Sequence, residues 1–217
     1  MLEKLLDLLF PPKCAFCKSV LKDGEKEICG KCKKALPYIP DAHVIRKGDY
    51  GRCAVTFYYE DMVPKGIHGL KFEGRQHCAA HFAPYMAQTV AEHFSGEFDA
   101  VTFVPISARR LRQRGYDQSA LLAGEMAKLW GVEALPTLKK IRHTKAQSTI
   151  AAPEERRANV LGAYAPLENA EIKGRRLLLV DDVLTTGSTM SACVSVLRRA
   201  GAVNVVCAAL ATPREKK

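Results

Sequence analysis

One stretch near the end of this chain constrains its fold more than any other, because it places a strand, two acids, a small-residue loop and a helix in order. The run from Leu177 to Val180 is continuously apolar, which is typical of a strand covered on both faces of a parallel sheet. Asp181 and Asp182 follow where that strand is expected to end. The loop 185–189 leads into residues 190–200, whose apolar positions have helical spacing. This layout predicts an anion site between a strand and a helix.

The loop itself is suited to a phosphate ester. Gly187 lets the backbone turn tightly and approach a ligand, and the amides and dipole of a helix N-terminus attract an anion. Thr185, Thr186, Ser188 and Thr189 add hydroxyl donors. The acids would repel a phosphate in direct contact, so we expect them to accept hydrogen bonds from sugar hydroxyls nearby. The pattern predicts a sugar-phosphate site and not a nucleotide-triphosphate loop, because the G-x-x-x-x-G-K-[ST] pattern is absent.

The string VDDVLTTGST resembles the phosphoribosyl pyrophosphate (PRPP) loop of type I phosphoribosyltransferases. In that family two adjacent acids hold the ribose hydroxyls, and the T-T-G-S-T turn holds the 5′-phosphate. A capped helix after a buried strand is the alternative, and it explains the hydroxyls but not the acids. The resemblance implies that Asp181 and Asp182 are the catalytic residues and assist Mg²⁺. The implied PRPP-binding residues here are Asp181, Asp182, Val183, Leu184, Thr185, Thr186, Gly187, Ser188 and Thr189.

Four cysteines near the start of the chain form two C-x-x-C pairs, Cys14 with Cys17 and Cys29 with Cys32, separated by eleven residues. This spacing lets four thiolates converge on one structural Zn²⁺ with no open coordination position. Disulfides are the alternative, disfavoured because the start of the chain does not have the features of a secretion signal. With so few apolar residues nearby, we expect the metal to supply most of this module's folding free energy.

The composition favours a polyanionic partner. Lysine and arginine total 33 against 23 acids in 217 residues, although a merely soluble basic protein is the simpler explanation. The first twelve residues are apolar but contain two acids and end in two prolines, so we expect neither a signal peptide nor a membrane span. Leu2, Leu5, Leu6 and Leu9 predict one helix face that packs on the body of the protein. Four of the eight cysteines fall in a metal-binding pattern and the chain is long for a secreted disulfide scaffold, so a reducing cytoplasm is favoured.

The remaining segments alternate between strands and helices. Strands are expected at 53–59, 98–104, 138–141, 162–164 and 204–210, and helices at 77–94 and 120–130, with Pro84 kinking the first helix or marking its start. This alternation predicts an α/β fold with a parallel sheet. Residues 1–50 are expected to form the zinc module, 51–217 the main domain, and 33–52 an irregular joint. Four other cysteines are expected to be small buried apolar residues, namely Cys53, Cys78, Cys193 and Cys207.

Arginines follow the strand at 98–104 directly, in the segment PISARRLRQRGYDQ. Ligands bind at strand ends in open α/β sheets, and arginine grips a pyrophosphate well. A solvated basic face is the alternative. Farther along, the polar stretch 142–160 is long enough to be a lid or a disordered loop. Three histidines on the helix expected at 77–94, His77, His81 and His93, complete no metal-ligand pattern.

Taken together, these motifs resemble the ComF family of ComFC-type competence proteins, which join a four-cysteine zinc finger to a type I phosphoribosyltransferase domain. The supporting strings are CAFC…CGKC, HGLKFEGR, VPISARRLRQRGYDQ, ERRANV and VDDVLTTGST, and they cover nearly the whole chain. The resemblance implies a pyrophosphate loop at Pro105, Ser107, Arg109 and Arg110, and a flexible lid containing Arg142, Thr144, Gln147, Arg157 and Asn159. Lys71 and Arg75 receive no role, and Asp117 stands where the family often has Asn, mildly unfavourable beside a pyrophosphate.

Two hypotheses follow for the function. In the first, the protein binds PRPP and Mg²⁺ and handles single-stranded DNA during DNA uptake in natural transformation. In the second, it is an active phosphoribosyltransferase that transfers the phosphoribosyl group to an unidentified nitrogen acceptor, as in nucleobase salvage. A third possibility is that the finger docks other competence or DNA-uptake proteins. Few aromatic residues accompany the basic segment, so stacking on bases has weak support.

Overall fold

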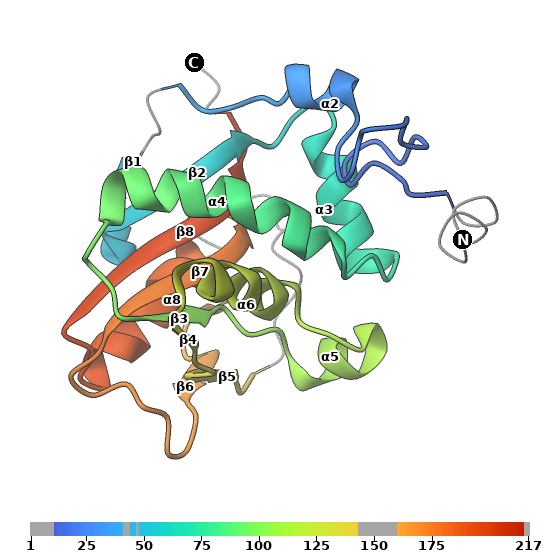
Figure 1. Ribbon diagram of the computed structural model, residues 1–217. Coiled ribbons are helices and arrows are strands. Elements are labelled where there is room, and N and C mark those ends of the chain that lie inside the picture. Colours follow the sequence, from blue (N-terminus) through green and yellow to red (C-terminus); the bar gives the residue numbers. More distant parts are fainter. Residues whose placement is uncertain (1–10, 41–43, 47, 143–159, 215–217) are drawn as a thin grey trace.

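The computed structural model describes residues 11–40, 44–46, 48–142 and 160–214. Its main sheet has six strands in the order β1-β2-β8-β7-β3-β4 (Figure 1). All neighbouring pairs are parallel except β1 with β2, which confirms the expected parallel α/β fold. The strands are β1 (Val44–Arg46), β2 (Arg52–Tyr58), β3 (Ala100–Phe103), β4 (Glu133–Ala134), β7 (Arg176–Val183) and β8 (Asn204–Thr212).

Strands β7 and β8 lie at the centre of the sheet, and the apolar run from Leu177 to Val180 is fully buried there. The strand is longer than expected. It continues through Asp181 and Asp182 to Val183, because β8 runs alongside it and pairs Asp181 with Ala209 and Val183 with Ala211. The two acids are therefore among the last residues of the strand and do not follow it. Because they are neighbours in a strand, their side chains lie on opposite faces of the sheet.

Helices cover both faces of the sheet (Figure 1). On one face, α3 (Val63–Phe72), α4 (Cys78–Phe94) and α6 (Gln118–Trp130) pack on alternate residues of β7 and β8, and on the other face lies α8 (Ser188–Arg199). Helix α4 begins at Cys78, so Pro84 does not mark its start. Pro84 is exposed, so the carbonyl left without its donor can be bonded by water. The helices α3 and α5 (Ala108–Arg114) were not expected from the sequence.

The remaining elements are short. Strands β5 (Leu138–Lys140) and β6 (Tyr164–Pro166) form a separate antiparallel pair, and the 3₁₀ turn η1 (Gly48–Tyr50) precedes β2. The described residues of the joint expected at 33–52 include β1 and η1, so they are more regular than predicted. Tyr50 is 2% exposed and packs in the core beneath α8. Cys53, Cys78, Cys193 and Cys207 are all buried, as expected. Among the helices described, none combines the length and apolar character needed to cross a bilayer.

The cysteine module, with its short helix α2 (Gly30–Lys34), packs directly on the sheet domain. Phe16 has no exposed surface, and its ring lies 4.9 Å from that of Phe82 and 6.0 Å from that of Phe57. Gly66 permits this approach, because a Cβ atom there would lie 2.9 Å from the Phe16 ring. Residues 14–16 therefore belong to the same apolar cluster as α4, α6 and β8. The domain boundary at residue 50 remains a prediction.

We expect Phe16→Ala to lower the free energy of unfolding of the whole chain by ~3–5 kcal/mol, because it empties a buried ring site shared by the module and the sheet. Val20→Ala is the matched control in the same module. Val20 is 55% exposed, so its truncation should change stability by less than about 0.5 kcal/mol. Urea unfolding followed by far-UV circular dichroism measures both. A separate early transition that moves alone in Phe16→Ala would show that the module unfolds independently.

Candidate sugar-phosphate site

The two acids at the end of β7 have different surroundings. Asp181 Oδ1 accepts hydrogen bonds from the Ser119 hydroxyl at 3.0 Å and from the Asp182 amide at 2.9 Å. Asp182 is 4% exposed, and its Oδ1 lies 2.7 Å from the Lys71 ammonium. The other oxygen of Asp182, Oδ2, is buried without a hydrogen-bond partner. One acid is thus held by hydrogen bonds and the other by an ion pair.

These surroundings shift the proton affinity of Asp181. Burial, reinforced by the neighbouring charge of Asp182, raises the pKa of Asp181 to about 7, against the opposing effects of Lys71, the Asp182 amide and Ser119. The carboxyl therefore exchanges a proton near neutral pH. Carboxylate oxygens are the hard ligands that Mg²⁺ prefers, and the unpartnered Oδ2 of Asp182 has a lone pair that could serve one. The chemistry of this oxygen is compatible with a magnesium ion.

The loop after β7 forms a tight turn at the start of α8. The Thr186 and Ser188 hydroxyls lie 2.8 Å apart, and the Ser188 amide donates to Thr186 Oγ1 at 3.4 Å. Gly187 has a φ of 74°, the left-handed conformation that favours glycine, and it lies against the ring of Tyr50. The first amides of an α-helix have no acceptor within the helix, so the turn presents donors and a positive dipole end to a ligand.

The segment after β3 lies beside the acids. Ser107 caps α5 by accepting from the Arg110 amide at 3.4 Å, and it bridges to Lys140. Pro105 is buried at the start of this segment. Arg110 is half-buried in the wall of a pocket of about 250 Å³, whereas Arg109 is exposed and outside that wall. The pocket is lined by Lys71, Phe72, Gly74, Arg110, Gln113, Arg114 and Tyr116.

Asp117 has a structural role that the sequence did not indicate. Its carboxylate caps α6 by accepting from the amides of Ser119 at 2.9 Å and Ala120 at 3.2 Å, and it also accepts from the Ile106 amide at 2.8 Å. Burial raises the pKa of Asp117 despite these three donors. The carboxylate is turned to the backbone, so it ties the segment after β3 to α6 instead of opposing an anion in the pocket.

Two further residues that sequence reasoning missed lie near Asp181. Burial lowers the pKa of Lys140 to about 8, with the Arg110 charge adding to the effect, and the Lys140 ammonium lies 5.0 Å from the centre of the Tyr164 ring. Burial also raises the pKa of Tyr164. Lys140 stands in a short strand without a motif, so only its position across from Ser107 relates it to the site.

Of the residues assigned to a lid, only Arg142 is within the described part of the chain. Its guanidinium donates to the Leu161 carbonyl at 2.7 Å. Thr144, Gln147, Arg157 and Asn159 lie outside the described residues, as do the leucines of the expected N-terminal helix. The lid therefore stays a prediction.

The four module cysteines meet in one cluster. The ligand sulfurs of Cys14, Cys17, Cys29 and Cys32 all lie within 4.8 Å of one another, and every one is a free thiol. The Cys17 and Cys29 sulfurs are 3.6 Å apart, close to the roughly 3.8 Å edge of a tetrahedron with Zn–S bonds of about 2.3 Å. Backbone amides of Cys29 and Cys32 donate to sulfurs at 3.4 Å, as suits thiolate ligands. The cluster fits zinc and not a pair of disulfides.

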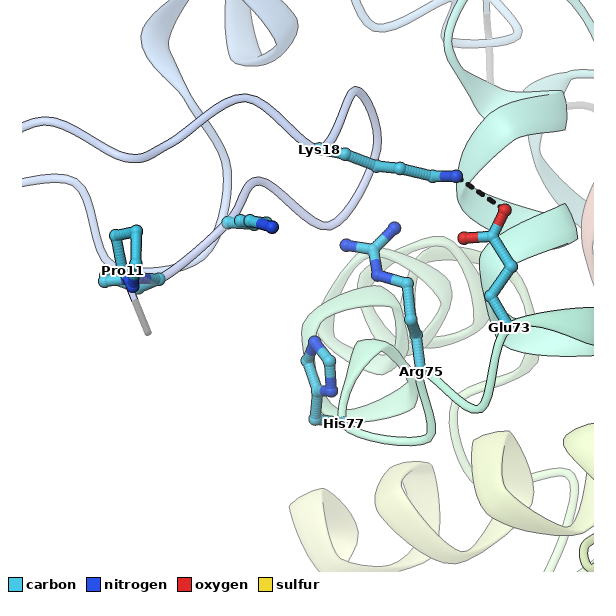
Figure 2. A pocket seen from close by; sticks show the side chains of 7 residues that line it. Pro11, Lys18, Glu73, Arg75 and His77 are labelled. Carbon is cyan, nitrogen blue, oxygen red and sulfur yellow. Dashed lines mark hydrogen bonds and ion pairs between the residues drawn. The ribbon is translucent and has the colours of Figure 1, made fainter. Parts of the chain in front are cut away.

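Charged side chains join the module to the end of α3. Arg75 donates to the carbonyls of Cys14 at 2.9 Å and Ala15 at 3.2 Å. Lys18 pairs with Glu73 at 2.5 Å (Figure 2). These contacts give Arg75 a role that the sequence alone did not supply. Beside them is a pocket of about 540 Å³ between the module and the turn after α3, lined by Pro11, Pro12, Lys13, Lys18, Glu73, Arg75 and His77.

Comparison with known proteins supports both parts of this arrangement. The family model of the phosphoribosyl transferase domain matches residues 99–217, and that of the double zinc ribbon domain matches residues 5–45. DNA utilization protein YhgH of Escherichia coli O157:H7 is 30% identical over 91% of this chain and 96% of its own length. Competence protein F of Haemophilus influenzae is 27% identical over 88% of this chain and 80% of its own length. Competence protein ComFC of Streptococcus pneumoniae is 26% identical over 88% of this chain and 84% of its own length. The ribbon match and the four-sulfur cluster support a structural zinc site.

We expect Gly187→Ala to destabilise the protein by about 2 kcal/mol or more, because the left-handed backbone costs ~1–2 kcal/mol for a residue with a Cβ. In addition, that Cβ would lie 2.3 Å from the Tyr50 ring. Gly124→Ala is the matched control, since Gly124 lies inside α6 with open space around its Cβ position. There alanine should add up to ~1 kcal/mol of stability. Equal effects of the two changes in urea unfolding would contradict the geometry of the turn.

The raised pKa of Asp181 predicts that this residue lowers the stability of the folded protein as pH rises. The folded pKa of about 7 lies above the ordinary value of 3.8, so the folded state binds the proton more tightly, and stability falls as pH rises from 4 to 7. Asp181→Asn should therefore be more stable than the wild type at pH 8 by up to roughly 4 kcal/mol, because each pKa unit corresponds to about 1.4 kcal/mol, or by about ten degrees in melting temperature.

The measurement is thermal unfolding in magnesium-free buffer between pH 5 and pH 8. The gap between Asp181→Asn and the wild type should widen up to pH 7 and then stay constant. Asp49→Asn, at an exposed aspartate, should show no such widening. A gap independent of pH would mean that Asp181 is ionised throughout this range.

Proposed function

The chain belongs to the ComF family, with a double zinc ribbon joined to a phosphoribosyl transferase domain, and on that premise we propose that it binds PRPP with Mg²⁺ and handles single-stranded DNA in DNA uptake. The observation that carries the proposal is the pairing of two acids at the end of β7 with the Gly187 turn at the start of α8. A sugar phosphate would contact both features, with its phosphate at the Gly187 turn and its ribose at the two acids. A helix that is merely capped at this turn would not explain the acids.

Each end of PRPP has matching groups in this arrangement. The 5′-phosphate would accept from the amides and hydroxyls of 185–189, and the ribose hydroxyls would donate to Asp181. The pyrophosphate would lie toward the pocket whose wall includes Arg110 and Arg114, where these two cations offset its charge. Asp181 and Asp182 are the residues that would hold Mg²⁺, which when bound neutralises phosphate oxygens. Protein positioning and charge stabilisation, without a covalent nucleophile, are what these side chains offer.

The DNA part of the proposal draws on the relatives' printed names and on the charge of this chain. The excess of ten positive charges suits a polyanion. The pocket between the module and α3 presents Lys13, Lys18, Arg75 and His77 around a single acid, Glu73, which is already paired with Lys18. We place DNA phosphates at this surface. A cytoplasmic setting is proposed because the four thiols must stay reduced to bind zinc.

A second candidate function is phosphoribosyl transfer. A nitrogen nucleophile would attack C1 of the ribose, the bond from C1 to the pyrophosphate oxygen would break, and pyrophosphate would leave with the electron pair. The nucleophile's proton needs an acceptor, and Asp181, with its pKa of about 7, is suited to that step. The acceptor is some nitrogen base that these residues do not specify. A third candidate is docking of other DNA-uptake proteins by the zinc module.

The test is titration calorimetry of PRPP with MgCl₂, together with pyrophosphate release in the presence of a panel of nucleobases. The wild type should bind PRPP, and the double variant Asp181→Asn, Asp182→Asn should lose at least tenfold in affinity. Release of pyrophosphate with one base, absent in the double variant, would establish the transferase and name its acceptor. A wild type that binds no PRPP, while folded and zinc-loaded, would refute the proposed site.

The same preparation tests the DNA part by mobility of labelled single strands over a salt series. Affinity should fall steeply with salt, because counterions are released from the strand. Lys13→Glu should weaken binding severalfold more than Lys65→Glu, which makes the same charge change at an exposed lysine outside the pocket. Equal weakening by the two changes would move the DNA away from this surface.

A further inference from the structure

We infer that Lys71 is a positioning residue of the sugar-phosphate site, which sets the orientation of Asp182 from a helix held in place by the zinc module. The inference rests on the proposed function, because it assumes that Asp182 belongs to the ligand site. Lys71 lies outside the segment that matches the transferase model, residues 99–217. A residue that precedes the matched transferase segment would therefore contribute to the sugar-phosphate site.

The contact between Lys71 and Asp182 is short and sheltered. The ammonium lies 2.7 Å from Asp182 Oδ1, and the two side chains are 23% and 6% exposed. Within the described residues, Lys71 forms the only ion pair of this carboxylate, and Oδ2 has no hydrogen-bond partner. A buried carboxylate that loses its partner is left uncompensated and is driven to turn toward other donors or water. Without Lys71, Asp182 would therefore change its direction.

Helix α3 fixes the position of Lys71. The lysine lies in the last turn of the helix, where a cation is favourable, and the preceding Leu70 carbonyl accepts a hydrogen bond from the Tyr116 hydroxyl at 2.6 Å. Tyr116 is itself in the wall of the pocket that contains Arg110. The end of α3 is thus fastened to the segment proposed to receive the pyrophosphate.

The zinc module supports the same turn of α3 from its other side. The amide of Arg75 donates to the Gly69 carbonyl at 3.3 Å, and the Arg75 side chain packs on Gly69. Its guanidinium then holds the carbonyls of Cys14 and Ala15, the first ligand of the metal cluster and its neighbour. A continuous set of contacts leads from the cysteine cluster to Lys71 and on to Asp182. This gives the HGLKFEGR string, including Gly69, Lys71 and Arg75, a physical reason.

Lys71 also lies in the wall of the pocket proposed for the pyrophosphate, so it contributes charge at this site as well as packing. It lines the pocket of about 250 Å³ together with Arg110 and Arg114. The Arg114 side chain reaches Gln118 and stacks over Phe72, and Lys71 alone among these three cations pairs with an acid of the site. Removing its charge should therefore act on ligand affinity chiefly through Asp182.

The test is a double-mutant cycle on PRPP affinity, measured by calorimetry with MgCl₂ on the full zinc-loaded chain. The variants are Lys71→Met, Asp182→Asn and their combination, with Lys65→Met as control at an exposed lysine of the same helix. We expect Lys71→Met to raise Kd about tenfold or more, and to change Kd less than about twofold once Asp182 is Asn. Melting temperatures, measured alongside, separate lost affinity from lost folding, and titrations are made well below them.

Each outcome decides the inference. Loss of affinity in Lys71→Met that disappears in the Asp182→Asn background supports positioning, since a purely structural lysine would lower stability without this coupling. Unchanged affinity, or a loss that is fully additive with Asp182→Asn, overturns it while leaving the proposed function intact. A wild type that binds no PRPP overturns both, and that result is distinguishable because it is seen before any substitution is compared.

Discussion

Two carboxylates at the end of a buried central strand are the constraint on which the rest of this molecule depends. Taking an ionised carboxylate out of water costs several kcal/mol unless it is paired or hydrogen-bonded. Asp181 meets this cost with the Ser119 hydroxyl, a backbone amide and a raised pKa, and Asp182 with the Lys71 ammonium. The beginning of α6 and the end of α3 must therefore lie where they do, and each is fixed in turn by further contacts.

The zinc module also helps to fix the position of α3. The four cysteine ligands gather in this module, Phe16 from the same segment fills the main core, and Arg75 holds the module's backbone to α3. The module is consequently a support for the helix that carries Lys71, as well as a basic surface of its own. The alignment with the YhgH protein of Escherichia coli O157:H7 covers 91% of this chain and 96% of that protein, so it includes residues of both parts.

The parts of the fold and site that could be predicted from the sequence are those formed by residues close together along the chain. The central strand, the turn at Gly187 and the cysteine cluster follow from short motifs, because their residues act on neighbours in sequence. The extension of β7 through the acids depended on pairing with β8, and the turn at 48–50 depended on burial of Tyr50 beneath α8. Neither partner is near in the sequence. Lys71 and Arg75 stood in a recognised string, but their roles required Asp182 and Cys14 to be placed in space.

The central claim is that the Gly187 turn and the acids of β7 together bind one sugar phosphate. A crystal structure of the full chain with PRPP and Mg²⁺ tests it most directly. The account predicts the 5′-phosphate on the amides at the start of α8, the ribose hydroxyls on Asp181, and the contact between Lys71 and Asp182 retained. A phosphate bound elsewhere, or a ribose that touches neither acid, would contradict it.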